Sequence, residues 1–355
     1  MTRDQFFTQT NNKKIVVYGS GTISGKVINK LEELNIFPEF ILETESTKKS
    51  FKNYKVSLLK DIEINFDEYI VILGFFNAYV DVLDLKNKLT RIGFGSLITF
   101  LDFYDFFPEY FGDIYWLTDK NYLKDKTESL DEVKNLLEDK KSKIIFEEVI
   151  KFRTTLNYNA LSSVDIDNQY FPNDIPKWKE PVNFIDLGAF NGDTIKLLND
   201  KYDINKIAAF EPDQENLKEL IEFLKKLNKE SIIFPNATSD GIKKMNFDAN
   251  AGAGSVVSEF GAETVTTIGI DQSLILFNPT LIKMDIEGSE YETLIGAEQT
   301  IKLTRPGLAV SIYHKPEDLF KIPLLLKRWN LNYSFYLRSH MYSSFDLALY
   351  AIPNK

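Results

Sequence analysis

The stretch FIDLGAFNGDT, residues 184–194, decides the fold of this chain. It begins with a short apolar run typical of a strand. Gly188 and Gly192 bracket a turn, and apolar residues recur at helical spacing from Ile195 onward. Glycine is needed where a backbone takes a positive φ or approaches a ligand closely. The pattern therefore predicts the first strand, turn and helix of an open parallel sheet, with a ligand lying across the turn.

A second acid follows the next predicted strand. The apolar run at residues 207–210 ends in Glu211, about 25 residues after Asp186. In nucleoside-binding sheets an acid at this place accepts hydrogen bonds from ribose hydroxyls. NAD and S-adenosylmethionine both carry a ribose. Asp186 in front of the turn favours S-adenosylmethionine, because its ammonium and sulfonium are cationic whereas NAD carries a pyrophosphate.

A third segment, LIKMDIEGSE at residues 281–290, is predicted as a strand, a group of acids and a helix running to about Leu303. Together with FIDLGAFNGDT, FEPD (210–213) and SIYHKPEDL (311–319), it closely resembles the FkbM family of methyltransferases. The resemblance covers residues 182–352 in the same order throughout. It implies an α/β class I methyltransferase fold, a Rossmann-like seven-stranded sheet with the last strand antiparallel. It also implies S-adenosylmethionine as cofactor and, usually, a hydroxyl oxygen as acceptor.

Cofactor contacts are expected at the glycine turn and at the ends of the second and third strands. The candidates are Asp186, Gly188, Ala189, Asn191, Gly192, Thr194, Glu211, Asp213, Asn236 and Ala237. Asn236 also has a local explanation, since Asn favours turns. Tyr170 and Phe171 are expected either to line the methionine end of the cofactor pocket or to cover the sheet edge.

The acceptor should meet residues at the carboxyl ends of the fourth and fifth strands. His314 is the first candidate for the general base, because its unperturbed pKa of about 6.5 lets it accept a proton near neutral pH. Asp285 is the alternative base, or orients the substrate. Candidate substrate contacts are Glu287, Ser255 in a glycine-rich loop like that of family members, and Arg338 and His340 in an expected turn before the last strand.

A divalent metal is a less favoured alternative. Asp285, Glu287 and His314 offer oxygen and nitrogen ligands, and a metal would lower the pKa of a bound hydroxyl. Against this, acids at the start of a helix are favoured simply by the helix dipole. The cofactor expectation is therefore S-adenosylmethionine without a metal.

The composition limits the classes of function. The 355 residues are 44% hydrophobic, enough for two domains with cores of their own. A net charge of −10 argues against a nucleic-acid partner, because phosphate binding needs clustered Lys and Arg. The absence of cysteine excludes disulfides and thiolate chemistry. No signal peptide or membrane-spanning run is evident, so we expect a cytoplasmic protein without membrane insertion. A homodimer is an option.

The N-terminal part reads as a second α/β unit. KKIVVY (13–18) followed by GSGTISG (19–25) predicts a strand and a nucleotide-type turn, although the spacing departs from GxGxxG. Residues 1–100 are therefore expected to form a small Rossmann-like domain whose ligand is open. Residues 101–180 are expected to form an aromatic and helical linker or cover, and residues 181–355 the methyltransferase domain.

The expected function is transfer of a methyl group to a hydroxyl of a sugar or glycan acceptor, for which the resemblance suggests bacterial surface polysaccharide biosynthesis. Two alternatives stay open. One is a nucleotide-sugar oxidoreductase that uses NAD in the N-terminal domain. The other is a non-catalytic nucleotide-sugar or glycan-binding protein.

Overall fold

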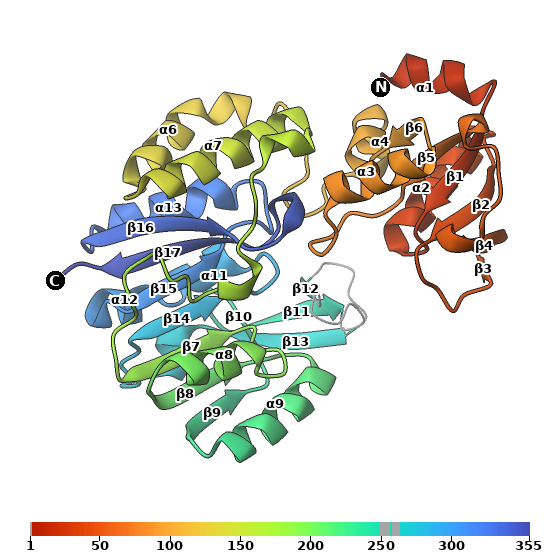
Figure 1. Cartoon of the computed structure of the whole chain (residues 1–355). Coiled ribbons are helices and arrows are strands. Elements are labelled where there is room, and N and C mark those ends of the chain that lie inside the picture. The colour runs from red at the N-terminus through yellow and green to blue at the C-terminus, as the bar shows by residue number, and fades with distance from the viewer. Residues whose placement is uncertain (1, 249–255, 258–262) are drawn as a thin grey trace. The chain divides into compact units, whose positions relative to one another are not determined.

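Three sheets form from the strands of this chain, whose computed structural model describes residues 2–248, 256–257 and 263–355. The chain divides into two units, each made of two segments (Figure 1). Unit 1 comprises Met1–Tyr122 with Val149–Ser162, and unit 2 comprises Leu123–Glu148 with Ser163–Lys355. The expected linker, residues 101–180, is thus shared between the two units.

Unit 1 is built on a six-stranded sheet in the order β3-β4-β2-β1-β5-β6. Its strands are β1 (Lys14–Tyr18), β2 (Pro38–Glu43), β3 (Ser50–Phe51), β4 (Tyr54–Leu58), β5 (Tyr69–Leu73) and β6 (Ser96–Ile98). All neighbours pair in parallel except β3 with β4. The interior strand β5, between β1 and β6, is buried along its whole length, as expected of an apolar run covered on both faces. The predicted smaller α/β domain is confirmed.

Helices complete unit 1. They are α1 (Arg3–Thr10), α2 (Thr22–Glu33), α3 (Val82–Ile92), α4 (Phe100–Phe106) and α5 (Pro108–Phe111), with short 3-10 turns η1 (Leu59–Asp61), η2 (Phe66–Glu68) and η4 (Tyr158–Ala160). The GSGTISG turn joins β1 to α2. The aromatic-rich residues 100–111 form α4 and α5, and their rings pack inside this unit: the Phe6 ring centroid lies 5.6 Å from that of Phe106 and 5.9 Å from that of Phe103.

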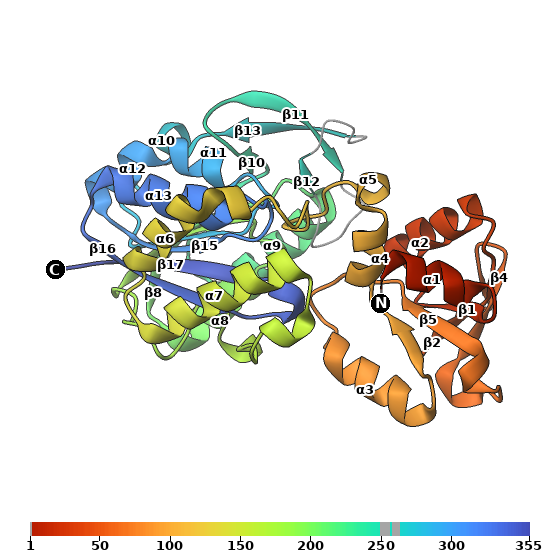
Figure 2. The same ribbon diagram turned by 90° about the horizontal axis from the view of Figure 1, so that it is seen from above.

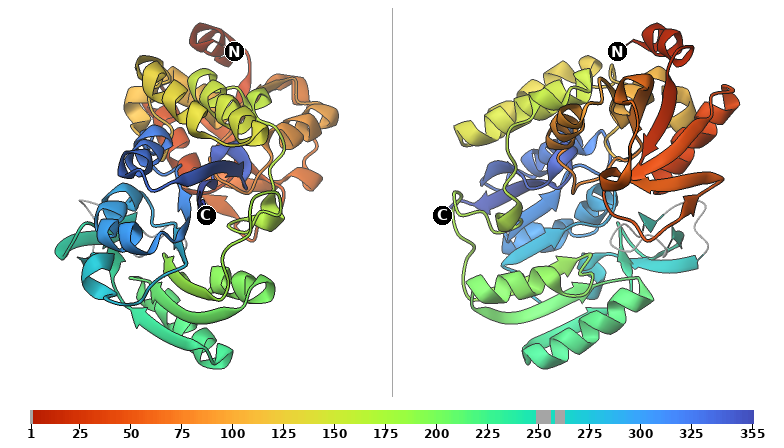
Figure 3. Two further views of the ribbon diagram at one scale, coloured as in Figure 1. Left: turned by 90° about the vertical axis from the view of Figure 1, so that its left-hand side faces the viewer. Right: turned by 45° about the vertical axis from the view of Figure 1, so that its right-hand side comes forward.

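Unit 2 is built on a seven-stranded sheet in the order β16-β17-β15-β14-β7-β8-β9. Its strands are β7 (Val182–Leu187), β8 (Ile204–Phe210), β9 (Glu230–Phe234), β14 (Leu281–Met284), β15 (Gly307–Ser311), β16 (Tyr333–Ser339) and β17 (Leu347–Pro353). The last strand, β17, runs antiparallel to both of its neighbours, and every other pair is parallel. The predicted methyltransferase sheet is confirmed, and the C-terminus lies just beyond β17 (Figure 3).

Two layers of helices cover this sheet because the order of connection reverses at β7. Figure 2 shows α8 (Asp193–Lys201) and α9 (Gln214–Leu227) on one side, and α11 (Glu290–Ile295), α12 (Glu298–Thr304) and α13 (Asp318–Trp329) on the other. The single helix predicted up to Leu303 is divided at Gly296, whose backbone lies against Ser239: a Cβ on Gly296 would stand 2.1 Å from the Ser239 carbonyl oxygen.

The remaining elements of unit 2 lie outside the main sheet and its two layers. Helix α6 (Thr127–Leu136) packs on α13, and helix α7 (Lys140–Thr155) continues into unit 1 from Val149 onward. Both lie within the expected helical linker or cover. A small four-stranded sheet, not anticipated from the sequence, has the order β10-β13-β11-β12. It is formed by β10 (Ala237–Thr238), β11 (Lys243–Asp248), β12 (Val256–Val257) and β13 (Glu263–Ile268), and is followed by α10 (Ile270–Ser273). Short 3-10 turns are η3 (Lys124–Lys126), η5 (Ile166–Asn168) and η7 (Tyr342–Ser344).

None of the helices in the described ranges is long and apolar enough to cross a membrane.

Candidate active site

Four neighbouring strands of the main sheet end in the residues that carry the chemistry. β8, β7, β14 and β15 lie side by side, and their carboxyl ends lead to Glu211, Asp186, Asp285 and His314 respectively. In an open parallel sheet this edge, next to the point where strand order reverses, is where ligands bind. The structure therefore brings the predicted cofactor acids and the predicted catalytic pair to one edge.

The glycine turn after β7 is shaped by the neighbouring strand and helix. Gly188 has φ +78° and Gly192 has φ +92°, conformations that side chains disfavour. A Cβ on Gly188 would stand 2.0 Å from the Asp285 carbonyl oxygen, and one on Gly192 would stand 2.4 Å from the Phe223 ring. Both glycines are thus required by packing, which holds the turn close to the end of β14.

Glu211 fastens this turn to the end of β8. Its Oε2 accepts a hydrogen bond from the Phe190 backbone N–H at 2.8 Å, and its Oε1 accepts one from the Asp213 N–H at 2.9 Å. Burial raises the pKa of Glu211 to about 7, although these N–H donors oppose the shift. Each carboxylate oxygen retains a lone pair after these bonds, so the group can still accept hydrogen bonds from a ligand hydroxyl.

Asp186 is fully buried at the end of β7 and is paired with a lysine that the sequence analysis did not single out. Lys283 Nζ lies 3.1 Å from Asp186 Oδ1 and donates a hydrogen bond to the Gly188 carbonyl oxygen at 2.6 Å. Burial raises the pKa of Asp186 to about 6, against the pull of Lys283. Both groups are therefore charged at neutral pH, and the pair holds the turn from beneath. The sequence feature that could have predicted this pair is the lysine within the apolar strand LIKM, since a buried lysine requires a partner.

Asp285 is held by the hydroxyls of two tyrosines. Tyr170 donates a hydrogen bond to Asp285 Oδ2 at 2.7 Å, and Tyr313 donates one to Oδ1 at 3.5 Å. Burial would raise the pKa of Asp285, but the positive charges of His314 and Lys283 outweigh it and lower the pKa. Asp285 is therefore a fixed carboxylate, with its side chain still 24% exposed. The Tyr170 hydroxyl thus points to the end of β14.

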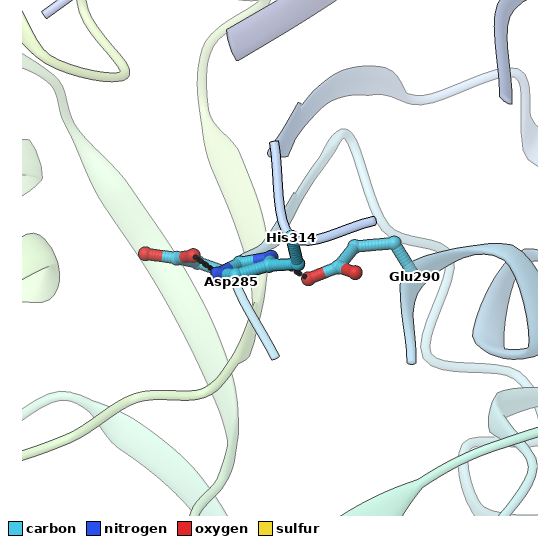
Figure 4. A group of neighbouring side chains, drawn as sticks. All are labelled: Asp285, Glu290 and His314. Atoms are coloured by element: carbon cyan, nitrogen blue, oxygen red, sulfur yellow. Dashed lines mark ion pairs between the residues drawn. The ribbon is translucent and has the colours of Figure 1, made fainter. Parts of the chain in front are cut away.

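His314 lies between carboxylates on both sides of its ring (Figure 4). Its Nδ1 is 2.9 Å from Glu290 Oε1, and its Nε2 is 3.4 Å from Asp285 Oδ1 and 3.6 Å from Glu287 Oε2. Burial would lower the pKa of His314, but the carboxylates, Glu290 first, raise it to about 10. The ring is therefore an imidazolium at neutral pH, with only 2% of its side chain exposed.

The metal alternative named Asp285, Glu287 and His314, and carboxylate oxygens of Asp285 and Glu287 lie 3.4 and 3.6 Å from His314 Nε2. Ligand atoms of Asp285, Glu290 and His314 lie within 4.8 Å of one another. However, the imidazole itself occupies the space between the two carboxylates, one facing Nδ1 and the other Nε2. A single ion binds a histidine through one nitrogen, so these three side chains would have to rearrange before they ligated one metal.

Other cofactor candidates lie around the same edge and have structural partners. Asp213 caps the N-terminus of α9 and accepts hydrogen bonds from the N–H groups of Glu215 and Asn216. Ala189 and Thr194 are buried, the Asn191 side chain contacts Glu219, Asn236 donates to the Thr266 carbonyl, and Ala237 lies in β10. Ser255 lies outside the described residues.

The structure does not bring Arg338 and His340 to the Asp285–His314 pair. β16 continues to Ser339, so Arg338 lies in the strand and not in the expected turn. Its buried guanidinium pairs with Asp139 at 2.6 Å and with Asp174 at 3.0 Å. His340 is buried, with Nδ1 2.7 Å from the Asp165 carbonyl oxygen and Nε2 2.7 Å from the Tyr350 hydroxyl. Burial lowers the pKa of His340, so this ring is neutral.

Comparison with known proteins agrees with this architecture. A sequence model described as Methyltransferase FkbM domain matches residues 186–335. The crystal structure of a methyltransferase FkbM from Methylobacillus flagellatus KT superposes with a TM-score of 0.79 at 18% identity, covering 98% of this chain and 92% of that one. A fibrillarin/Nop5p complex gives a TM-score of 0.33 at 19% identity over 51% of this chain and 77% of its own, too low to inform the fold. No curated protein matches the sequence significantly.

The family match spans β7 to β16, the elements that hold Asp186, Glu211, Asp285 and His314. This part of the chain matches the FkbM methyltransferase domain, and the chain shares its fold with an FkbM methyltransferase of solved structure.

Proposed function

We propose that the protein transfers a methyl group from S-adenosylmethionine to a hydroxyl oxygen of a sugar or glycan. The observation that carries this proposal is the convergence of Asp186, Glu211, Asp285 and His314 on the carboxyl edge of one sheet, within an FkbM methyltransferase domain. Glu211 suits the ribose of a cofactor, the buried Asp186–Lys283 pair holds the glycine turn beneath it, and the Asp285–His314 pair suits an acceptor.

The residues at this edge fit S-adenosylmethionine by charge and by hydrogen bonding. Among the described residues at the edge, carboxylates outnumber cationic side chains, as suits an ammonium and a sulfonium. Glu211 would hold the ribose hydroxyls with its remaining lone pairs, and the turn from Gly188 to Gly192 would lie beneath the cofactor. When bound, the cofactor supplies an electrophilic methyl group that needs no further activation.

The protein's own contribution is to place the acceptor hydroxyl and to receive its proton. Asp285 is the more exposed member of the catalytic pair and is a carboxylate at neutral pH. As the new carbon–oxygen bond forms, the hydroxyl becomes far more acidic, so a carboxylate is a sufficient proton acceptor. The proton therefore passes from the acceptor oxygen to the Asp285–His314 pair.

A sugar hydroxyl suits the exposed groups of the site. Asp285 and Glu287 are 24% and 16% exposed and present carboxylate oxygens, which accept hydrogen bonds from neighbouring hydroxyls of a carbohydrate. The same oxygens disfavour an anionic acceptor at this point because like charges repel. The family resemblance supports an acceptor from surface polysaccharide biosynthesis.

Calorimetric titration of the purified protein with S-adenosylhomocysteine, alongside NADH, tests the cofactor. We expect micromolar binding of S-adenosylhomocysteine and none of NADH. Tritium transfer from labelled S-adenosylmethionine to a panel of neutral mono- and oligosaccharides then tests the acceptor. Binding of NADH alone would refute the methyltransferase proposal and move the ligand site to unit 1.

A further inference from the structure

Glu290 is a buried carboxylate that contacts both the loop before α11 and the ring of His314. Its side chain has no exposed surface. Its Oε1 accepts a hydrogen bond from the Ile286 backbone N–H at 2.8 Å, within the loop that carries Asp285 and Glu287. The same oxygen lies 2.9 Å from His314 Nδ1. The Glu290 carboxylate therefore joins the loop after β14 to His314 in the segment after β15.

These contacts decide where the hydrogens of His314 lie. The Glu290 oxygen already receives an N–H, so it faces Nδ1 as an acceptor, and Nδ1 must carry a hydrogen. Nε2 faces the carboxylate oxygens of Asp285 and Glu287. A bare nitrogen lone pair there would face negative oxygens, so Nε2 also carries a hydrogen. The ring is then doubly protonated and bridges carboxylates on opposite sides.

Exposure separates the roles of the two members of the pair. The side chain of Asp285 is 24% exposed, whereas that of His314 is 2% exposed. An incoming hydroxyl therefore reaches the Asp285 carboxylate and not the imidazole. Since His314 already holds its hydrogens, it has no lone pair to offer.

We propose that Glu290 is a positioning residue that holds His314 as a fixed imidazolium behind Asp285, so that Asp285 and not His314 receives the acceptor's proton. In this step the acceptor oxygen would take the methyl carbon from the sulfonium sulfur, and the electron pair of the broken carbon–sulfur bond would stay on the sulfur of S-adenosylhomocysteine. The acceptor O–H bond breaks, and its proton moves to an Asp285 oxygen and from there to solvent. The division of roles rests on the proposed methyl transfer, whereas the state of the ring can be tested without it.

Other ionisable groups also face this ring. Besides Asp285, Glu287 and Glu290, the neighbouring elements contribute Asp318 from α13 and Asp346 from the loop before β17. Both carboxyls interact with the charge of His314, and burial raises their pKa values to about 7 and about 6. Burial also raises the pKa of Glu287 to about 7, so Glu287 and Asp318 are only partly ionised at neutral pH. Asp285, whose pKa is lowered, is the ionised carboxylate nearest to Nε2, and its charge favours the imidazolium.

The chain has only two histidines, so nitrogen NMR can observe each ring directly. We would label the full-length protein with ¹⁵N-histidine and record two-bond ¹H–¹⁵N correlation spectra between about pH 6 and 8, assigning the signals with His314→Gln. We expect both nitrogens of His314 to be protonated throughout. His340 is the internal control: its Nδ1 faces a carbonyl oxygen and its Nε2 the Tyr350 hydroxyl, so it should stay neutral.

Glu290→Gln removes the charge and keeps the length of the side chain. It should lower the titration midpoint of His314 by about one to three pH units while leaving His340 unchanged. The matched control is Glu292→Gln on the same helix, where the side chain of Glu292 is 46% exposed and pairs with Lys315 at 3.7 Å. This variant should leave the His314 midpoint unchanged.

Two results would overturn the proposal. One is a His314 ring that titrates near its ordinary value of about 6.5 in the unmodified protein, which requires no variant to fold. The other is loss of a ring proton when Mg²⁺ or Zn²⁺ is added near neutral pH, since this would make His314 a metal ligand. Failure of S-adenosylhomocysteine to bind would refute the proposed function and leave the ring measurement unaffected.

Discussion

Replacing Lys283 with Met should destabilise unit 2 strongly and in a pH-dependent manner. Lys283 and Asp186 are 4% and 0% exposed and lie 3.1 Å apart, so the variant leaves a buried carboxylate without its partner. Coulomb's law with an effective dielectric constant of about 20 gives about 5 kcal/mol for this separation. Removal of one member of a buried pair typically costs about 3–5 kcal/mol.

Protonation of Asp186 sets an upper limit on this cost. Neutralising a carboxyl whose native pKa is about 6 costs about 1.4 kcal/mol at pH 7 and close to nothing at pH 5. Loss of Lys283 raises the pKa of Asp186 further, so the native variant keeps the proton at pH values where the unmodified protein has lost it, and the penalty decreases as the pH falls. We therefore expect a loss that is about 1.4 kcal/mol larger at pH 7 than at pH 5.

Hydrogen exchange of the β7 and β14 peptides in increasing urea measures this loss within unit 2 alone. The control is Lys302→Met, which removes an exposed pair with Glu298 and should cost less than about 1 kcal/mol. The double variant with Asp186→Asn should cost less than the sum of the single changes, because no uncompensated charge remains. A loss that is independent of pH, or additive single changes, would refute the account of a charged pair beneath the turn.

Three further predictions concern the site and its support. Glu211→Gln should weaken S-adenosylhomocysteine binding at least about tenfold in calorimetry. In the unmodified protein the affinity should fall as the pH drops through about 7, because the Glu211 carboxylate becomes protonated. The variant should not show this pH dependence. His314→Ala should retain S-adenosylhomocysteine affinity while methyl transfer falls about a hundredfold or more, and unchanged turnover would remove His314 from the mechanism. Arg338→Met should destabilise β16 by about 2–4 kcal/mol in hydrogen exchange, because it breaks the buried pairing with Asp139 and Asp174. The exposed pair of Lys141 with Asp174 provides the control, since Lys141→Met should cost less than about 1 kcal/mol.

The sequence predicts the sheets well wherever strands are continuous apolar runs. The antiparallel pairing of β17 with β16 follows from the short link between them, and the turn after β7 from its glycines. The small sheet was missed because β11 (KKMNFD) and β13 (ETVTTI) are largely polar and lack the apolar runs of the main sheet.

The side-chain contacts of the site residues were harder to predict than the elements in which these residues lie. Acids at the start of α11 have a local explanation in the helix dipole, so nothing in the sequence distinguishes Glu290 from its neighbours. Its role depends on His314, which is distant in the chain and meets it only in the folded sheet. Likewise, the polar residues before β17 resemble a solvent-exposed turn, and only the structure shows that Arg338 and His340 are buried with partners.

Helix α7 (Lys140–Thr155) spans the division between the units, since unit 1 includes Val149–Ser162. A cut between Tyr122 and Leu123 would leave unit 1 without Phe152, whose ring lies 5.1 Å from Trp116 in centroid distance. Because each unit consists of two segments of the chain, neither unit can be expressed as one continuous segment of the sequence. A protease that nicks the chain there should leave both fragments bound to each other until denaturant separates them.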